Sequence, residues 1–171
     1  MKRLYLLRHG KSSWDDPNLA DAERPLARRG VRALARMRKH LRRTGIHPDM
    51  VICSPARRTR ETLREIEPAL GRDVTVRIEP RVYEGGAGAL VDLVGESPEP
   101  VSSIMLIGHN PSLQNLAVSL AAEGDEALLA RVAEKFPTGA LAVITAPWSS
   151  WYDVGGGGGT LEELVLPREL A

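Results

Sequence analysis

Two arginines and two histidines are the residues of this chain whose types and settings could perform chemistry. Arg8 and His9 stand in "LRHGK" after the apolar run "RLYLL", Arg58 follows "DMVICS", and His109 follows "SSIMLIG". A neutral imidazole nitrogen is a nucleophile near pH 7, and arginine donates paired hydrogen bonds to phosphoryl oxygens. The set predicts a phosphoryl-transfer site in which His9 attacks phosphorus and the other three residues hold its oxygens.

Strands and helices alternate along the chain, and their order predicts where these residues meet. The apolar runs expected to form strands lie at 3–7, 49–54, 74–78 and 102–108, with helical segments between them. This order predicts an α/β fold, a three-layer α/β/α sandwich with a mostly parallel central sheet and helices on both faces. Because parallel strands end at one edge, where open sheets bind ligands, we expect His9, Arg58 and His109 to share a cleft.

The remaining elements follow from helical spacing and from glycine content. Helices are expected at 27–43, 56–70, 88–96 and 111–124. In the first of them Leu34, Met37 and Leu41 recur at helical spacing, and we expect that helix to end at Gly45. Two further strands are expected at 140–146 and 160–167, joined by "PWSSWYDVGGGGG". Its five glycines predict a flexible connection, and the role of the segment from Trp148 to Gly159 stays open.

Length and composition restrict the class of protein. The 171 residues, 43% hydrophobic and 26% charged, fit one globular domain over 1–171. The apolar run from Leu4 to Leu7 is too short for a signal peptide or a spanning helix, so we expect a cytoplasmic location and no membrane partner. Cys53 is the only cysteine, which excludes an intrachain disulfide and a cysteine-based metal cluster. We expect no metal and no cofactor.

Charge is distributed unevenly along the chain. Residues 1–72 carry 18 Lys and Arg against 8 Asp and Glu, whereas residues 73–171 carry 5 against 14. Much of the positive excess lies in the basic segment 27–43, which we interpret as a solvated helix face. Nucleic-acid binding is the lesser alternative, because no aromatic residue interrupts that segment, and we expect no nucleic-acid partner. A positive field is also compatible with attraction of anionic substrates.

Three motifs in this order resemble the histidine phosphatase superfamily, which has the phosphoglycerate mutase-like fold. They are "LRHGKSSW", "SPARRTRET" and "LIGHNPSL", and the last has the form found in the SixA-like phosphohistidine phosphatase branch. "RPLARRG" matches that branch in order and spacing, and the resemblance covers residues 3–120. It implies His9 as the phosphoryl acceptor. The residues that it implies for the phosphate pocket are Arg8, Ser12, Arg58 and His109.

Glu84 in "RVYEGG" separates two enzymatic interpretations. Many phosphomonoesterases of the superfamily carry an acidic residue in this region that protonates the leaving oxygen, whereas the SixA-like branch often lacks one. Glu84 is therefore either this proton donor or a carboxylate of a surface loop.

The predicted function is a metal-independent phosphatase that forms a phosphohistidine intermediate and acts on phosphohistidine in proteins. One alternative is a phosphomonoesterase for a small phosphorylated metabolite. Another is a non-catalytic module that binds phosphate or a phosphoprotein. The expected partner is thus a phosphorylated protein or a small phosphorylated substrate, and a monomer is favoured.

Overall fold

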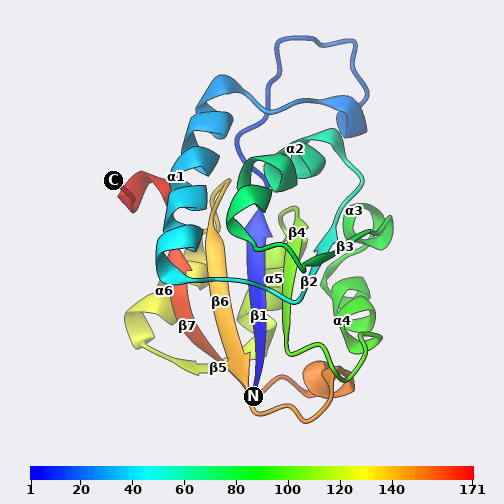
Figure 1. Ribbon diagram of the computed structural model, residues 1–171, viewed down its shortest axis with the longest axis vertical. Coiled ribbons are helices and arrows are strands. Elements are labelled where there is room, and N and C mark those ends of the chain that lie inside the picture. Colours follow the sequence, from blue (N-terminus) through cyan, green and yellow to red (C-terminus); the bar gives the residue numbers. More distant parts are fainter.

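One seven-stranded sheet forms the centre of the computed structural model, which describes residues 1–171 (Figure 1). Its strand order is β3-β2-β4-β1-β6-β7-β5. The strands are β1 (Lys2–Arg8), β2 (Met50–Cys53), β3 (Thr75–Ile78), β4 (Ser103–Gly108), β5 (Ala121–Gly124), β6 (Leu141–Ala146) and β7 (Gly159–Val165). Only β6 runs against its neighbours, so the sheet is mostly parallel, as the sequence predicts.

Helices cover both faces of the sheet, which confirms the predicted α/β fold. The α-helices are α1 (Arg28–Thr44), α2 (Arg57–Ile66), α3 (Arg81–Glu84), α4 (Ala87–Gly95), α5 (Ser112–Leu120) and α6 (Glu126–Glu134). Short 3-10 helices are η1 (Asp21–Glu23), η2 (Glu67–Ala69), η3 (Trp151–Gly156) and η4 (Pro167–Glu169). None of these helices has the length and apolar character needed to cross a membrane.

The core has two halves, one on each face of the sheet. Leu4 and Leu6 of β1 pack in the half that contains residues of α4, α5 and α6. Tyr5 and Leu7 pack in the half that contains residues of α1 and α2. Successive side chains of a strand point to opposite faces, so a buried strand must be apolar at every position, as β1 is from Leu4 to Leu7.

Helix α1 packs one face against the sheet and closely approaches the loop after β1. Leu34, Met37 and Leu41 are fully buried, and the helix ends at Gly45 with a left-handed φ of 69°, both as predicted. A Cβ atom on Gly30 would collide with the carbonyl oxygen of Lys11. Glycine at position 30 therefore lets the helix approach the backbone that follows the first strand.

The helix expected at 111–124 is too long, because its last residues form a strand. Helix α5 ends at Leu120, and β5 pairs with the start of β7. "AAEG" has no strong strand propensity, so a non-local pairing overrides the local preference. Helix α6 was not predicted from the sequence. Its N-terminus is capped by the side chain of Asp125.

The connection expected to be flexible at 148–159 forms the 3-10 helix η3 and packs through its two tryptophans, which corrects that prediction, although Gly155, Gly156 and Gly158 are exposed. Trp148 and Trp151 are 6% and 0% exposed, and their indole N–H groups donate to the carbonyls of Gly157 (2.8 Å) and Val101 (2.7 Å). Burial of two tryptophan rings offsets the conformational entropy lost by the glycines. Tyr152, by contrast, is 83% exposed.

Candidate active site

The register of the sheet places the carboxyl ends of β1, β2 and β4 side by side. Arg8 at the end of β1 pairs with Gly108 at the end of β4, and Cys53 ends β2 on the other side of β4. His9 and His109 are the next residues of their chains, and their ring centroids lie 5.3 Å apart. The structure thus brings together the two histidines that stand a hundred positions apart in the sequence.

His9 is buried in a neutral, singly protonated form. Its ring is 6% exposed, and Nδ1 lies 2.7 Å from the carbonyl oxygen of Gly10. A carbonyl only accepts, so Nδ1 carries the proton and Nε2 keeps a lone pair. Burial is the main cause that lowers the pKa of His9 to about 3; the charges of His109, Arg8 and Arg58 act in the same direction, and the hydrogen bond to Gly10 opposes them. At neutral pH the imidazole can act as a nucleophile.

Helices α1 and α2 hold the backbone of the loop that begins at Gly10. The N–H of Gly10 donates to the hydroxyl of Thr62 (3.1 Å), which donates to the carbonyl of Arg58 (2.7 Å). A Cβ on Gly10 would lie 2.9 Å from Cδ1 of Leu34, so a side chain here would displace the loop from α1. Glycine and threonine therefore fix the position of the carbonyl that orients His9.

His109 is oriented by Ser54, the first residue after β2. The Ser54 hydroxyl oxygen accepts from the N–H of Ala56 (3.2 Å) and lies 2.8 Å from Nε2 of His109. On the other side of the ring, Nδ1 lies 3.4 Å from Arg58 Nη2, so Ser54 and Arg58 together fix the orientation of His109. Burial and then the charge of Arg58 lower the pKa of His109 to about 4. His109 is therefore held as a neutral ring at pH 7 against the guanidinium of Arg58.

Arg58 is the arginine of α2 that faces this site. Its side chain is 7% exposed, Nη1 donates to the carbonyl of Asp21 (2.7 Å), and Nη2 donates to the Asp21 carboxylate (3.0 Å). Its Nε–H is buried and has no partner. Arg57 and Arg60 are exposed, and Arg57 pairs with Glu61 (2.9 Å). Helical geometry therefore directs only the middle arginine of the motif toward the histidines.

Arg8 lies on the other side of the site. Nη1 donates to the carbonyl of Phe136 (3.0 Å), whereas Nε–H is buried without a partner. Burial and then the charge of Arg58 lower the pKa of Arg8. We refer to Arg8, His9, Arg58 and His109 as the cationic pocket. Two guanidinium groups whose buried Nε–H donors have no acceptor favour a bound anion.

Three polar residues around this pocket were not predicted from the sequence. Asp21 on η1 accepts from Tyr83 OH (2.8 Å), and the Tyr83 ring meets the His109 ring edge-on at 5.4 Å. Arg24 is buried, stacks 3.5 Å above the Trp14 ring, and has an unpartnered Nη1. Asp21 and Arg24 lie in an aperiodic polar loop. The motif "RPLARRG" contains Arg24 and offered a signal for it, whereas no sequence pattern pointed to Asp21.

The two remaining predicted residues have less defined surroundings. Ser12 is buried and forms an isolated antiparallel β-bridge with Leu26. Its hydroxyl makes no hydrogen bond within the protein. Glu84 ends α3 rather than standing in a loop, and its carboxylate is exposed and forms no hydrogen bond or ion pair. It is its neighbour Tyr83 that contacts the residues of the site.

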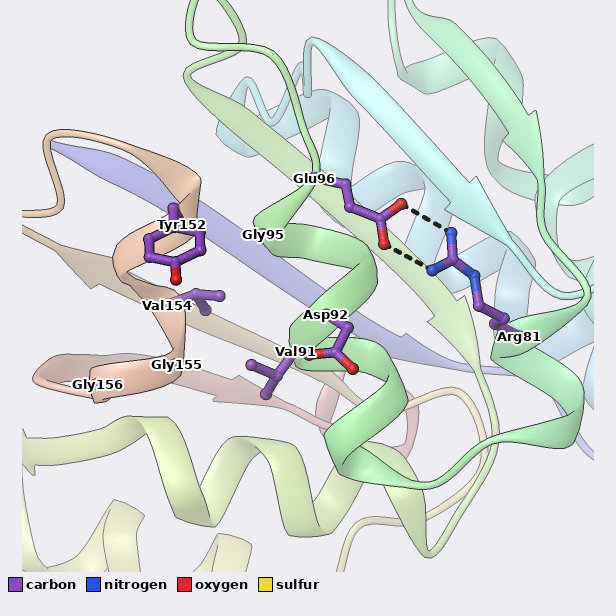
Figure 2. Close-up of a pocket in the computed structure, with 9 residues that line it drawn as sticks. All are labelled: Arg81, Val91, Asp92, Gly95, Glu96, Tyr152, Val154, Gly155 and Gly156. Atoms are coloured by element: carbon purple, nitrogen blue, oxygen red, sulfur yellow. Dashed lines mark hydrogen bonds and ion pairs between the residues drawn. The ribbon is translucent and has the colours of Figure 1, made fainter.

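A separate cavity of about 670 Å³ lies between α4 and η3 (Figure 2). Its lining residues are Arg81, Val91, Asp92, Gly95, Glu96, Tyr152, Val154, Gly155 and Gly156. None of the residues of the cationic pocket is among them. In Figure 2 the Arg81 guanidinium points toward the Glu96 carboxylate, to which it donates two hydrogen bonds. Neither cavity nor pocket contains a group of three or more His, Cys, Asp or Glu side chains that could hold a metal ion.

Comparison with known proteins identifies one family to which this chain is similar. The model of the histidine phosphatase superfamily (branch 1) matches residues 4–102. The uncharacterized protein Rv1276c of Mycobacterium tuberculosis is 34% identical over 164 residues, which are 95% of this chain and 100% of that protein. Phosphohistidine phosphatase SixA of Escherichia coli is 27% identical over 120 residues, 69% of this chain and 73% of SixA.

Solved structures agree with the sequence comparison. A protein from Nakamurella multipartitia assigned as a SixA phosphohistidine phosphatase superimposes with a TM-score of 0.82 and 28% identity, over 97% of this chain and 96% of that chain. The protein histidine phosphatase SixA in complex with tungstate superimposes with a TM-score of 0.78 and 24% identity, over 98% of both chains, and shares the fold.

Proposed function

The chain belongs to the histidine phosphatase superfamily, branch 1, a family of phosphatases, and from that premise we propose that it hydrolyses phosphohistidine in proteins through a phosphoryl group carried on His9. The proposed reaction needs no metal ion, because two arginines supply positive charge and N–H donors to the phosphoryl oxygens beside His109.

The main support for the proposal is the pair of unpartnered Nε–H groups beside a neutral nucleophile. Arg8 and Arg58 each leave this donor buried and unsatisfied, and both are near enough to His9 for their charges to lower its pKa. A buried charged donor without an acceptor is costly, so such groups favour a bound oxyanion. A phosphoryl group, with three oxygens and a negative charge, is an anion that several donors can hold at once.

Two displacement steps follow from this arrangement. In the first, the Nε2 lone pair of His9 forms a bond to phosphorus, and the bond from phosphorus to the substrate's leaving group breaks with its electron pair. In the second, water attacks phosphorus and the electron pair of the broken bond returns to His9. One water proton stays on the product phosphate and the other passes to solvent. Arg8, Arg58 and His109 stabilise the charge on the three oxygens in both steps.

The surroundings of the pocket favour a protein substrate. A cavity of about 790 Å³ lies along the loop between β1 and α1, and its lining includes Ser12, Trp14 and Arg29. Trp14 is 71% exposed. A substrate larger than a metabolite can therefore contact the surface next to His9. The similarity to the protein named phosphohistidine phosphatase SixA in Escherichia coli supports the same choice.

A phosphomonoesterase for small metabolites is the second candidate, and Glu84 is the residue that would favour it. Alkyl phosphates need a proton on the departing oxygen, and general acid catalysis typically contributes about a hundredfold to ten-thousandfold. Glu84 is exposed and free of hydrogen bonds, so it is accessible to substrate but is not oriented by any neighbour.

A panel of substrates tests the proposal. Wild-type protein is given a phosphohistidine peptide, an aryl phosphate and an alkyl phosphate, with and without a chelator. We expect the highest kcat/KM on the phosphohistidine peptide, poor turnover of the alkyl phosphate and no effect of the chelator. Protein quenched during turnover should carry phosphate on His9 in an acid-labile, alkali-stable linkage.

Glu84→Gln distinguishes the two enzymes, and Glu134→Gln, at another exposed and unpaired carboxylate, is the matched control. We expect little change in either variant on the phosphohistidine peptide. Strong wild-type hydrolysis of the alkyl phosphate that collapses only in Glu84→Gln would instead favour the metabolite phosphatase. Binding of phosphate without turnover of any substrate would indicate the non-catalytic module.

A further inference from the structure

Asp21 forms the outer wall of the cationic pocket. It belongs to η1, in the loop between β1 and α1 that extends past the end of β1 in Figure 1. Its side chain is 52% exposed, whereas the side chain of its partner Arg58 is 7% exposed. Asp21 therefore lies between the buried guanidinium and the solvent, at the mouth of the pocket.

The carboxylate of Asp21 has one acceptor position left. Oδ2 accepts from Arg58 Nη2 (3.0 Å) and from Tyr83 OH (2.8 Å), and Oδ1 accepts from Arg24 Nε (3.3 Å). A carboxylate offers about four lone-pair positions, two on each oxygen. Three of them are used, and the remaining position is on Oδ1 of a half-exposed side chain.

Arg58 can bind Asp21 and a phosphoryl group at the same time. A guanidinium has five N–H donors in a planar fork. Asp21 uses one on Nη1 and one on Nη2, and the Nε–H remains buried and unpartnered. Asp21 need not move when a phosphoryl group binds to the free donors, so it stays next to the group attached to phosphorus.

We propose that Asp21 accepts a hydrogen bond from the free ring N–H of the substrate's phosphohistidine and thereby makes the pocket selective for an imidazole leaving group. This inference rests on the proposed function. His9 attacks phosphorus and an in-line displacement expels the leaving group on the opposite side. We place that group beside Asp21 because Asp21 is hydrogen-bonded to Arg58, whose free donors hold the phosphoryl oxygens, and because its side chain is half exposed.

The chemistry of the leaving group explains the selectivity. The phosphorus–nitrogen bond of the substrate breaks, and its electron pair stays on that ring nitrogen. The other ring nitrogen keeps its proton, held by Asp21 Oδ1, so a neutral imidazole departs. An ionised carboxylate stabilises the protonated ring before the bond breaks. An alkyl phosphate has no N–H for Asp21, and its departing oxygen needs a proton that an ionised carboxylate does not supply.

Asp21 is held in the ionised form. The hydrogen bond from Tyr83 is the largest cause that lowers its pKa; burial opposes it, and the hydrogen bond and charge of Arg58 and the charge of Arg24 keep the net shift downward. No other acidic side chain contacts this carboxylate. At neutral pH the Asp21 carboxylate can accept a hydrogen bond but has no proton to donate.

Asp21→Asn tests the inference because it removes the charge and keeps the shape. Full-length wild type, Asp21→Asn and the matched control Glu23→Gln, on the same exposed turn, are assayed with a phosphohistidine peptide and an aryl phosphate. We expect Asp21→Asn to lose about tenfold to a hundredfold in kcat/KM on phosphohistidine and less than about threefold on the aryl phosphate. Glu23→Gln should match the wild type on both.

The pH dependence of turnover is a second measurement, and it would not change if Asp21 had only a structural role. In Asp21→Asn the fall of phosphohistidine turnover at rising pH should begin at lower pH, because the ring proton is held less tightly, while the aryl-phosphate profile stays unchanged. Tyr83→Phe removes one donor to Asp21 and should lower phosphohistidine turnover by only a few-fold. It keeps the test available if Asp21→Asn fails to fold.

Equal losses on both substrates in Asp21→Asn, with an unchanged pH profile, would show that Asp21 only holds Arg58 in place. That result overturns the role of Asp21 and leaves the proposed function intact. Wild-type protein that hydrolyses the aryl phosphate through His9 but leaves phosphohistidine untouched overturns both.

Discussion

The cationic pocket and the cavity between α4 and η3 both contain arginine, and they differ in how its donors are satisfied. In the cavity, Arg81 Nη1 and Nη2 donate to Glu96 (2.6 and 3.0 Å), and Nε donates to Glu79 (3.1 Å). In the pocket, Arg8 and Arg58 keep buried Nε–H groups without acceptors. Both nitrogen edges of Arg81 are matched by carboxylates, whereas Arg8 has no carboxylate partner and Arg58 shares only Asp21, so each pocket arginine keeps an unsatisfied Nε–H.

The pKa shifts follow the same division. Hydrogen bonds from Arg81 lower the pKa of Glu96 and of Glu79, as expected for opposite charges in contact. In the pocket, burial and like charge lower the pKa of Arg8. The comparison teaches that volume does not identify the site: uncompensated buried charge beside a nucleophile is the distinguishing feature.

His9→Ala should have the largest effect, because it removes the proposed bond to phosphorus. Loss of a covalent nucleophile costs on the order of a millionfold in kcat in a well-studied protease. Turnover should fall to background, and no phosphoryl group should be trapped on the protein. The exposed His47→Ala is the control. A trapped phosphoserine in His9→Ala would contradict the assignment.

Arg58→Ala and His109→Ala should each lower kcat by about a hundredfold to a thousandfold, as is typical for one lost donor to a charged transition state. Arg57→Ala, which removes an exposed arginine one position away, should stay within about twofold of wild type. Steady-state kinetics on the phosphohistidine peptide measure the difference. Equal effects of Arg57→Ala and Arg58→Ala would contradict a special role for the arginine that keeps a buried, unsatisfied Nε–H.

The buried histidines predict a loss of stability in acid. The pKa of His9 falls from 6.5 to about 3 on folding, so between these values the unfolded chain binds a proton that the folded chain does not. The free energy of unfolding should therefore fall as pH falls from 6.5 toward 3, by up to about 1.4 kcal/mol per pH unit for this residue. Urea unfolding at several pH values should give a shallower slope for His9→Gln, and an unchanged slope would contradict the burial of a neutral ring.

Ser54→Ala should lower kcat about tenfold, the effect of losing one orienting hydrogen bond. The alanine removes the hydrogen bond between the Ser54 hydroxyl and Nε2 of His109, so the ring is held less firmly. The substrate KM should change less than kcat. Ser13→Ala, at a hydroxyl that bonds only to the backbone N–H of Asp15, provides a comparison outside the pocket.

Glu96→Gln should have the smallest effect. It removes a carboxylate from the cavity of Figure 2, and pairs between exposed side chains contribute little to stability. We expect kcat/KM within about twofold of wild type and a nearly unchanged Tm. A loss of about tenfold or more would show that the cavity is coupled to the site, through α3, which carries both Arg81 and Tyr83.

Local patterns in the sequence were sufficient for most of the fold. The run from Leu4 to Leu7, the spacing of Leu34, Met37 and Leu41, and the glycine at position 45 predict β1, α1 and its end from local rules alone. The parallel order of strands then places His9 and His109 at one edge, because that placement depends only on strand direction. The prediction was wrong where the structure depends on a contact between distant segments: β5 forms because it pairs with β7.

What the sequence by itself determined was the set of residues that could meet at the edge of the sheet, together with the family that their motifs resemble. Only the tertiary structure decided the protonation of His9, the partner of His109 and the presence of Asp21 and Tyr83 at the pocket. Burial, ring orientation and contacts across 62 positions depend on packing between distant segments, which no local pattern encodes. For the same reason the two tryptophans before the glycines pack into the core, although the glycines alone predict a flexible connection.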